Sequence, residues 1–161
     1  MIKPESIVET EQFINIAQME YDRFVERIKI DDYKRAALLI LKAQANGGRL
    51  HITGIGKPAH ICGYGASLLS STGTPCYMLH GTEAVHGSCG QLVSGDVVIC
   101  ISNSGETAEL KATVRAILNN DCQIIAITGN EQSWLARQAQ VHLFAGVAQE
   151  GDPLNRAPRA S

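Results

Sequence analysis

The feature of this sequence that most restricts its fold is a set of short hydrophobic runs after Gly48. Most of these runs do not alternate with polar residues, as half-exposed strands would. Strands buried on both faces have this composition, and they occur in parallel sheets covered by helices. The runs are 50–53, 76–79, 97–101, 124–127 and 141–144. The stretches between them are long enough for crossover helices, so the sequence predicts a three-layer α/β/α domain with a doubly wound, five-stranded parallel sheet of the flavodoxin-like kind.

Two helices are predicted before the sheet. In the first, apolar residues recur every seven positions and form one stripe. The stripe consists of Ile7, Ile14, Tyr21 and Ile28, with Ala17 and Phe24 beside it. It must be covered by its own domain or by a second subunit, and the sequence leaves both open. We expect the second helix from Asp31, as N-cap, to Asn46, with a stop at Gly47–Gly48.

Composition limits the classes of protein to which the chain can belong. With 161 residues, 45% hydrophobic and 19% charged, it fits a single domain over 1–161, with helices in 1–47 and an α/β core in 48–161. A net charge of −2 and no basic run disfavour a nucleic-acid partner. No run is long and apolar enough to span a membrane and no signal peptide is visible, so we expect a cytoplasmic protein. The 5 cysteines form no CxxC pair and are expected to be reduced thiols.

Polar, glycine-rich segments follow the first and third predicted strands. Ligands of open parallel sheets bind at the carboxyl ends of strands. The first segment, Gly54-Ile55-Gly56-Lys57, combines glycines that allow close backbone approach with a lysine at a helix start. The second, 102–107, offers three hydroxyls at another helix N-terminus, more than one helix cap uses. A capped turn is the plain alternative, but the position at a strand end favours a phosphate site.

Nucleotide cofactors are disfavoured by the same loops. A dinucleotide site requires an acidic residue at the end of the second strand, where this chain has His80-Gly81. The spacing of a Walker motif is absent around Lys57. We therefore predict no cofactor.

In its motifs the chain resembles the sugar-isomerase (SIS) domains of arabinose-5-phosphate isomerases. The matching stretches run in the family's order from about Gly48 onward. They are 54–57, 71–75, 83–84, 86–87, 102–106, 126–130, 135–137, 153–155 and 157–158. The resemblance implies an aldose-ketose isomerase of carbohydrate metabolism that interconverts D-arabinose 5-phosphate and D-ribulose 5-phosphate through an enediol. It also implies a homo-oligomer, either a tetramer or a dimer.

The resemblance also assigns roles to residues. The implied catalytic residues are Lys57, Glu109, Glu150 and His86. The implied phosphate-binding residues are Ser102, Asn103, Ser104, Gly105 and Thr107. Further substrate contacts are implied for Gly54, Gly56, Ser71 and Thr72.

Each catalytic assignment has a plain alternative. Lys57 could be a solvated lysine, and Glu109 could only stabilise its helix dipole. Glu150 could be solvated, and only the resemblance singles it out. His86 could be a metal ligand or a buried polar group, but no other histidine gives ligand spacing, so we predict no metal.

The chain departs from the family in ways that affect substrate choice and activity. Pro58-Ala59 stands where the family has Ser-Gly, and Gly151-Asp152 where it has Ala-Cys. The family's closing helix and later histidine have no counterpart before Ser161, so we expect poor turnover by this chain. The competing hypothesis is a non-catalytic module that senses a phosphosugar.

Overall fold

The computed structural model describes residues 5–151, and the side chains of 9–151. The chain divides into two compact units: residues 1–28 with 145–161, and Lys29–Phe144. The expectation of one domain over 1–161 stays a prediction.

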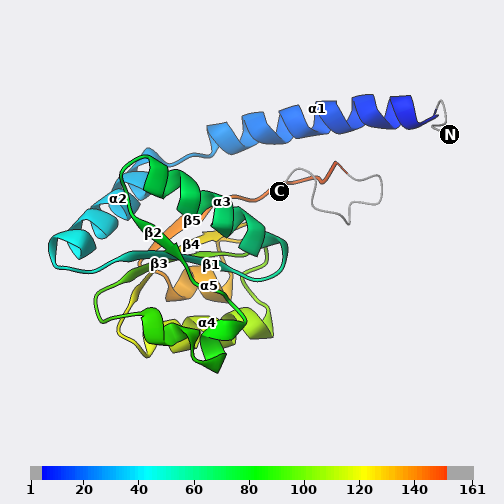
Figure 1. Cartoon of the computed structure of the whole chain (residues 1–161). Helices are drawn as coiled ribbons and strands as arrows, with labels where there is room; N and C mark the ends of the chain where they lie inside the picture. The colour runs from blue at the N-terminus through cyan, green and yellow to red at the C-terminus, as the bar shows by residue number, and fades with distance from the viewer. Residues whose placement is uncertain (1–4, 152–161) are drawn as a thin grey trace. The chain divides into compact units, whose positions relative to one another are not determined.

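The larger unit is built on five parallel strands in the order β2-β1-β3-β4-β5 (Figure 1). Their bounds are β1 Leu50–Gly54, β2 Cys76–Met78, β3 Val97–Ile101, β4 Gln123–Thr128 and β5 Val141–Phe144. Every residue of β1 is buried, and so are the first four of β3. This burial on both faces explains why the runs do not alternate with polar residues, and it confirms the predicted fold class.

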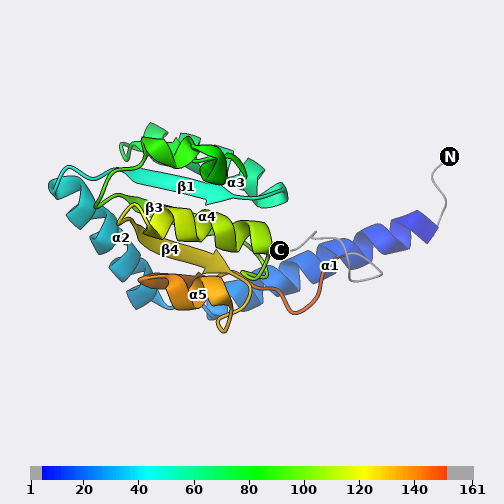
Figure 2. The ribbon, with the colours of Figure 1, turned by 90° about the horizontal axis from the view of Figure 1, so that it is seen from below.

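Helices cover both faces of the sheet and create two hydrophobic clusters. α2 (Ile30–Ala45) and α3 (Lys57–Ser71) pack on one face, while α4 (Ala108–Leu118) and α5 (Trp134–Gln138) pack on the other. The 3₁₀ turns η1 (Glu83–His86) and η2 (Ser88–Gln91) lie on the α4 side. Figure 2 shows α4 and α5 against the strands from below. These layers are those that the sequence predicted.

The start of α2 differs from the prediction. Asp31 lies inside the first turn and is not the N-cap, a position that Lys29 occupies without a side-chain cap. The Asp31 carboxylate pairs with Lys34, one turn ahead, at 3.1 Å. Acidic residues in the first turn interact favourably with the helix dipole without capping the helix. The predicted N-cap, Asp31, therefore lies after the observed N-cap, Lys29. The stop at Gly47 is confirmed, because this glycine has a φ of 81°.

The smaller unit contains α1 (Glu5–Glu26) and a segment that runs from Ala145. On α1 the predicted stripe is not buried in the single chain, because Ile14 and Tyr21 are exposed. Glu20 is buried and accepts a hydrogen bond from the Ala148 amide at 2.7 Å. The side chain of Ile7 lies outside the described residues.

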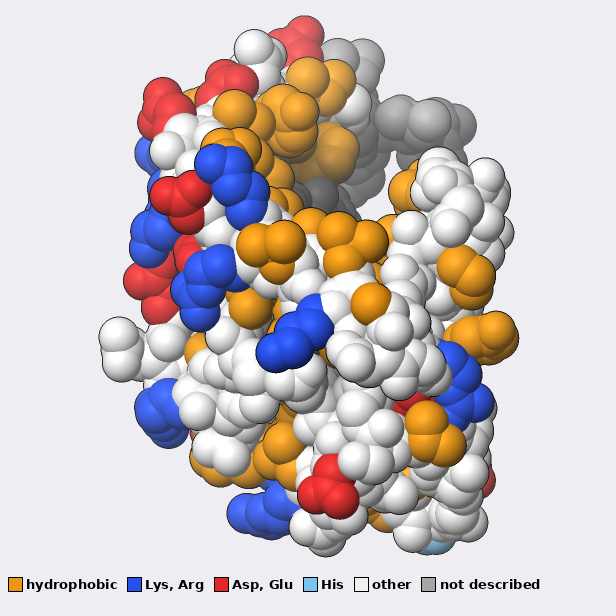
Figure 3. Space-filling view, turned by 90° about the vertical axis from the view of Figure 1, so that its left-hand side faces the viewer, with side chains coloured by type: hydrophobic (Ala, Val, Ile, Leu, Met, Phe, Trp, Pro, Cys, Tyr) orange, Lys and Arg blue, Asp and Glu red, His pale blue; other side chains and the backbone are white. Residues whose placement is uncertain are grey.

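Apolar side chains also remain exposed on the outer face of α2 and α3. Figure 3 shows hydrophobic side chains scattered among charged ones on one side of the molecule. The exposed residues of α2, α3 and the edge strand β2 include Leu38, Leu41, Ile61, Tyr64, Leu68 and Tyr77. Within residues 5–151, no helix has the length and hydropathy of a membrane span.

Candidate phosphosugar site

The candidate site lies at the carboxyl ends of β1 and β3. These strands are neighbours in register, with Gly54 opposite Ile101 at their ends. From β1 the chain proceeds to β2 on one side, and from β3 it proceeds to β4 on the other. This is the topological switch point, where open α/β sheets bind their ligands. The loops that begin at Ile55 and Ser102 therefore start side by side.

The loop after β1 depends on two glycines. Gly56 has φ 72° and ψ −132°, a backbone conformation that residues other than glycine rarely adopt. A Cβ on Gly54 would come within 2.9 Å of the Pro58 Cβ, so glycine allows α3 to pack directly against the strand end. Lys57 is the first residue of α3, and it is exposed. Pro58 follows it in the first turn of the helix, as predicted.

The loop after β3 is folded by its own serines. The Ser102 hydroxyl accepts a hydrogen bond from the Gly105 amide at 3.1 Å, and the Ser104 hydroxyl accepts one from the Glu106 amide at 3.3 Å. In each case the oxygen acts as acceptor, so the hydroxyl hydrogen can still be donated to an anion. Ser104 is exposed and Ser102 is half-buried.

Gly105 fixes this loop against α5. Its φ is 63°, and a Cβ there would lie 2.5 Å from the Ser133 hydroxyl oxygen. The Gly105 carbonyl accepts a hydrogen bond from the Leu135 amide at 3.1 Å. The loop is thus held in shape before any ligand arrives.

The amino end of α4 follows this loop and is free of side-chain capping. Thr107 is the N-cap, extended at φ −64° and ψ 147°, and its side chain makes no cap hydrogen bond. The first amides of a helix have no partner within the helix and carry partial positive charge. An anion can therefore bind here. Glu109 lies in the same first turn and is exposed.

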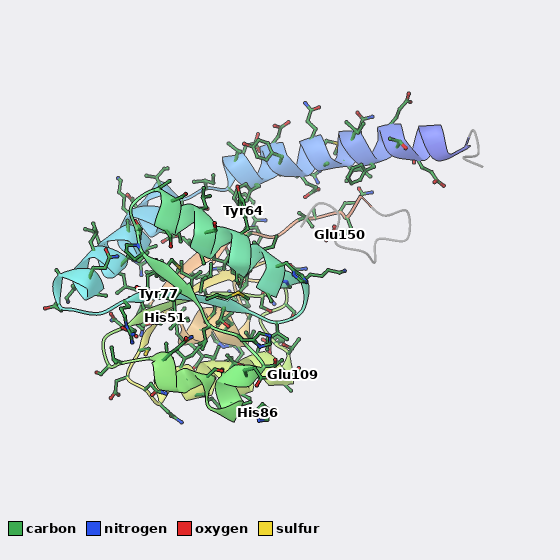
Figure 4. The ribbon with its side chains drawn as sticks, viewed as in Figure 1. His51, Tyr64, Tyr77, His86, Glu109 and Glu150 are labelled. Atoms are coloured by element: carbon green, nitrogen blue, oxygen red, sulfur yellow. The ribbon has the colours of Figure 1, made fainter. Side chains whose placement is uncertain are left out.

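A third segment, after β2, is packed against the first. A Cβ on Gly81 would lie 2.8 Å from the Gly54 carbonyl oxygen. The Thr113 hydroxyl of α4 donates to the Gly81 carbonyl at 2.6 Å. η1, which carries the exposed His86, packs against α4. Figure 4 shows His86 and Glu109 on the same side of the sheet.

Two of the predicted site residues are not brought to this edge, namely Ser71 and Thr72. Ser71 and Thr72 end α3, where their hydroxyls donate to carbonyls of the preceding turn, namely Leu68 and, for Thr72, also Leu69. Because α3 returns antiparallel to β1, they lie at the amino edge of the sheet. Within one chain they are remote from the loops. Glu150 belongs to the smaller unit, so its role stays a prediction.

Comparison with known proteins fits this geometry. The family model described as the SIS domain matches residues 43–154. The chain belongs to the SIS domain family. The arabinose 5-phosphate isomerase KdsD of Pseudomonas aeruginosa is 40% identical over 148 residues, which make up 92% of this chain and 44% of that protein. The chain thus spans less than half the length of that relative.

Solved structures of related proteins have the same fold as this SIS domain. An Escherichia coli protein in complex with arabinose 5-phosphate has a TM-score of 0.85 and 34% identity, covering 100% of this chain and 84% of that one. A Bacteroides fragilis protein, described as a putative phosphosugar isomerase involved in capsule formation, has a TM-score of 0.81 and 35% identity. That match covers 94% of this chain and 80% of the other.

Sequence reasoning missed residues that hold the loops of the SIS domain in place. Thr113 lies in the middle of α4 and carries no motif, although it fixes the loop after β2. Glu106 was read only as part of a motif, yet its carboxylate accepts hydrogen bonds from the Lys111 ammonium at 2.7 Å and from the Trp134 amide at 2.6 Å. Trp134 is 28 residues from Glu106 in the sequence, so no local pattern predicts the hydrogen bond between them.

The thiols of the SIS domain are not activated. All 5 cysteines are free and buried. Burial raises the pKa of Cys62 to about 12 and the pKa of Cys76 to about 11. A thiol is nucleophilic only as thiolate, so these groups are packing residues near neutral pH. Among residues 5–151, no group of three or more His, Cys, Asp or Glu side chains could hold a metal ion.

Proposed function

We propose that this SIS domain interconverts D-arabinose 5-phosphate and D-ribulose 5-phosphate. The observation that carries the proposal is the pairing, at one switch point, of a hydroxyl-rich loop at an uncapped helix end with a lysine loop. The first suits a phosphate and the second suits a developing oxyanion. The relatives described above support the choice of substrate.

The proposed reaction needs few groups. A base removes the proton from the carbon next to the carbonyl, an enediol forms, and the proton is returned to the neighbouring carbon. Glu109 brings a carboxylate to the edge of the sheet where Lys57 brings an ammonium group. We assign Lys57 to stabilising the enediolate oxygen and a carboxylate, Glu109 or Glu150, to proton transfer. His86 completes the proposed catalytic set from η1.

Phosphate recognition is assigned to the loop after β3. The Ser102, Ser104 and Thr107 hydroxyls donate to the phosphate oxygens, together with the Asn103 amide and the first amides of α4, while the Gly105 amide holds the loop through Ser102. The unphosphorylated sugar offers no anion to this loop. The proposal includes a homo-oligomer in the cytoplasm.

The competing function is a non-catalytic module that binds a phosphosugar. Incubation with ribulose 5-phosphate, followed by NMR, reports whether arabinose 5-phosphate forms, and a titration of the same sample reports binding. We expect both binding and product. Saturable binding without product selects the module, and no binding refutes both functions.

A further inference from the structure

Glu106 poses an electrostatic problem for the phosphate loop. It directly precedes the N-cap Thr107, so its backbone lies at the amino end of α4. A carboxylate near a helix N-terminus is attracted to the same amides as a phosphate. If the Glu106 side chain turned toward α4's first amides, it would compete with the substrate and repel it.

In the structure both oxygens of this carboxylate are hydrogen-bonded to groups other than the first amides of α4. One oxygen accepts from the Lys111 ammonium at 2.7 Å and the other accepts from the Trp134 amide at 2.6 Å. Both bonds, with the hydrogen bond to Lys111 as the larger cause, lower the pKa of Glu106, so the group is ionised at neutral pH. The negative charge of the Glu106 carboxylate is paired with the Lys111 ammonium group.

The two helix starts are treated differently. The short helix α5 is capped, because the Ser133 hydroxyl accepts from the Ala136 amide at 3.2 Å and Glu106 accepts from the Trp134 amide. The longer α4 receives no side-chain cap. The protein thus uses its own acid at α5 and leaves the amides of α4 available.

We propose that Lys111 is a positioning residue that holds the Glu106 carboxylate against α5 and so keeps the phosphate position at the start of α4 free of competing negative charge. This rests on the proposed phosphosugar binding. Lys111 lies one turn into α4 from Thr107, and its ammonium also lies 5.8 Å from the centroid of the Trp134 ring.

The chain offers a matched control. Arg115 lies one turn further along α4, with its guanidinium carbon 5.5 Å from the same Trp134 ring. Arg115→Met removes a positive charge and the same type of ring contact, but it leaves the Glu106–Lys111 pair intact. Lys111→Met removes that pair.

The test is calorimetric titration of the full chain with arabinose 5-phosphate, inorganic phosphate and unphosphorylated arabinose. For Lys111→Met we expect the Kd of both phosphate-bearing ligands to rise about fivefold at low salt, as loss of one partly exposed ion pair allows. The Kd of arabinose should not change, and the effect should shrink at high salt because added ions screen the released carboxylate. Adding Glu106→Gln to Lys111→Met should restore most of the affinity, since it removes the unpaired charge.

An unchanged phosphate Kd in Lys111→Met, an equal loss in Arg115→Met, or no restoration in the double variant would overturn the proposal. Its failure is distinguishable from that of the proposed function. If the unmodified chain binds phosphosugar but forms no product, the isomerase assignment fails and the role of Lys111 is still decided by the Kd values.

Discussion

At the scale of single residues, the account depends most on Lys57. This lysine is exposed at the first position of α3, so its replacement should cost little stability. We predict that Lys57→Ala lowers kcat by about 10²–10³-fold, the size of effect seen when one oxyanion donor is removed. The melting temperature should change little. Lys42→Ala, at an exposed lysine in the last turn of α2, is the control. Wild-type turnover in Lys57→Ala would contradict this prediction and show that Lys57 is only a solvated surface lysine.

A second prediction at this scale concerns His51, which is fully enclosed beside Asp96. Its Nε2 lies 3.0 Å from the Asp96 carboxylate, and the Tyr77 ring packs against it (Figure 4). Burial lowers the pKa of His51, although Asp96 opposes the shift. Asp96 itself has a lowered pKa: burial raises it, but hydrogen bonds from the Val93 and Arg49 amides and the Arg49 guanidinium outweigh burial.

These pKa shifts determine how the free energy of unfolding depends on pH. The unfolded chain binds a proton at His51 at a higher pH than the folded chain does, so the free energy of unfolding falls as pH falls below about 6.5. The pKa of His142 is also lowered by burial and acts in the same direction. We predict that urea denaturation between pH 7.5 and 5.5 shows a shallower pH slope for His51→Gln than for the wild type. Equal slopes would show that His51 does not titrate differently on folding.

At the scale of elements, the lysine loop requires a special glycine. Gly56 sits at φ 72° and ψ −132°, whereas Gly63 lies inside α3, where an added Cβ would meet only the Met78 sulfur at 3.8 Å. We predict that Gly56→Ala destabilises the protein by about 1–3 kcal/mol because of backbone strain. Gly63→Ala should stabilise it by about 0.5–1 kcal/mol through helix propensity. Chemical denaturation of both variants checks the pair, and a neutral Gly56→Ala would contradict the strained geometry.

The elements also show what the sequence could and could not predict. The inner strands were predictable because burial on both faces leaves continuous apolar runs, as in Val97–Ile101. The edge strand β2 is exposed after Cys76, so its apolar run does not reflect burial on both faces. The loops after β1 and β3 were predictable because strand ends of a parallel sheet meet at one edge. The positions of Ser71 and Thr72 were not predictable, because a sequence motif does not show at which edge of the sheet its residues lie. In the structure their hydroxyls donate to a carbonyl in the last turn of α3. The partners of Glu106 were hidden too, since Trp134 is 28 residues away.

At the scale of the whole molecule, exposed apolar surface favours self-association. Ile14 and Tyr21 of α1 are exposed, as are Leu38 and Leu41 of α2. Leu38 and Leu41 are three residues apart in one helix and therefore lie on the same face, and contiguous exposed apolar patches mark contacts between proteins. We predict that light scattering at micromolar concentration gives a mass of two or four chains of 17.3 kDa. Leu38→Glu with Leu41→Glu should reduce the mass if α2 forms the contact, and a monomer of wild-type sequence would contradict the prediction.

The central claim is that the edge formed by β1 and β3 carries enediol chemistry on a phosphosugar. The most direct measurement is NMR of arabinose 5-phosphate with the protein in D₂O, which follows the proton on the carbon next to the aldehyde. Removal of this proton by a protein base should replace it with deuterium or lead to ribulose 5-phosphate, at a rate that Lys57→Ala lowers. The account predicts loss of that signal or appearance of the ketose. A sample that saturates with ligand yet shows neither change would contradict it.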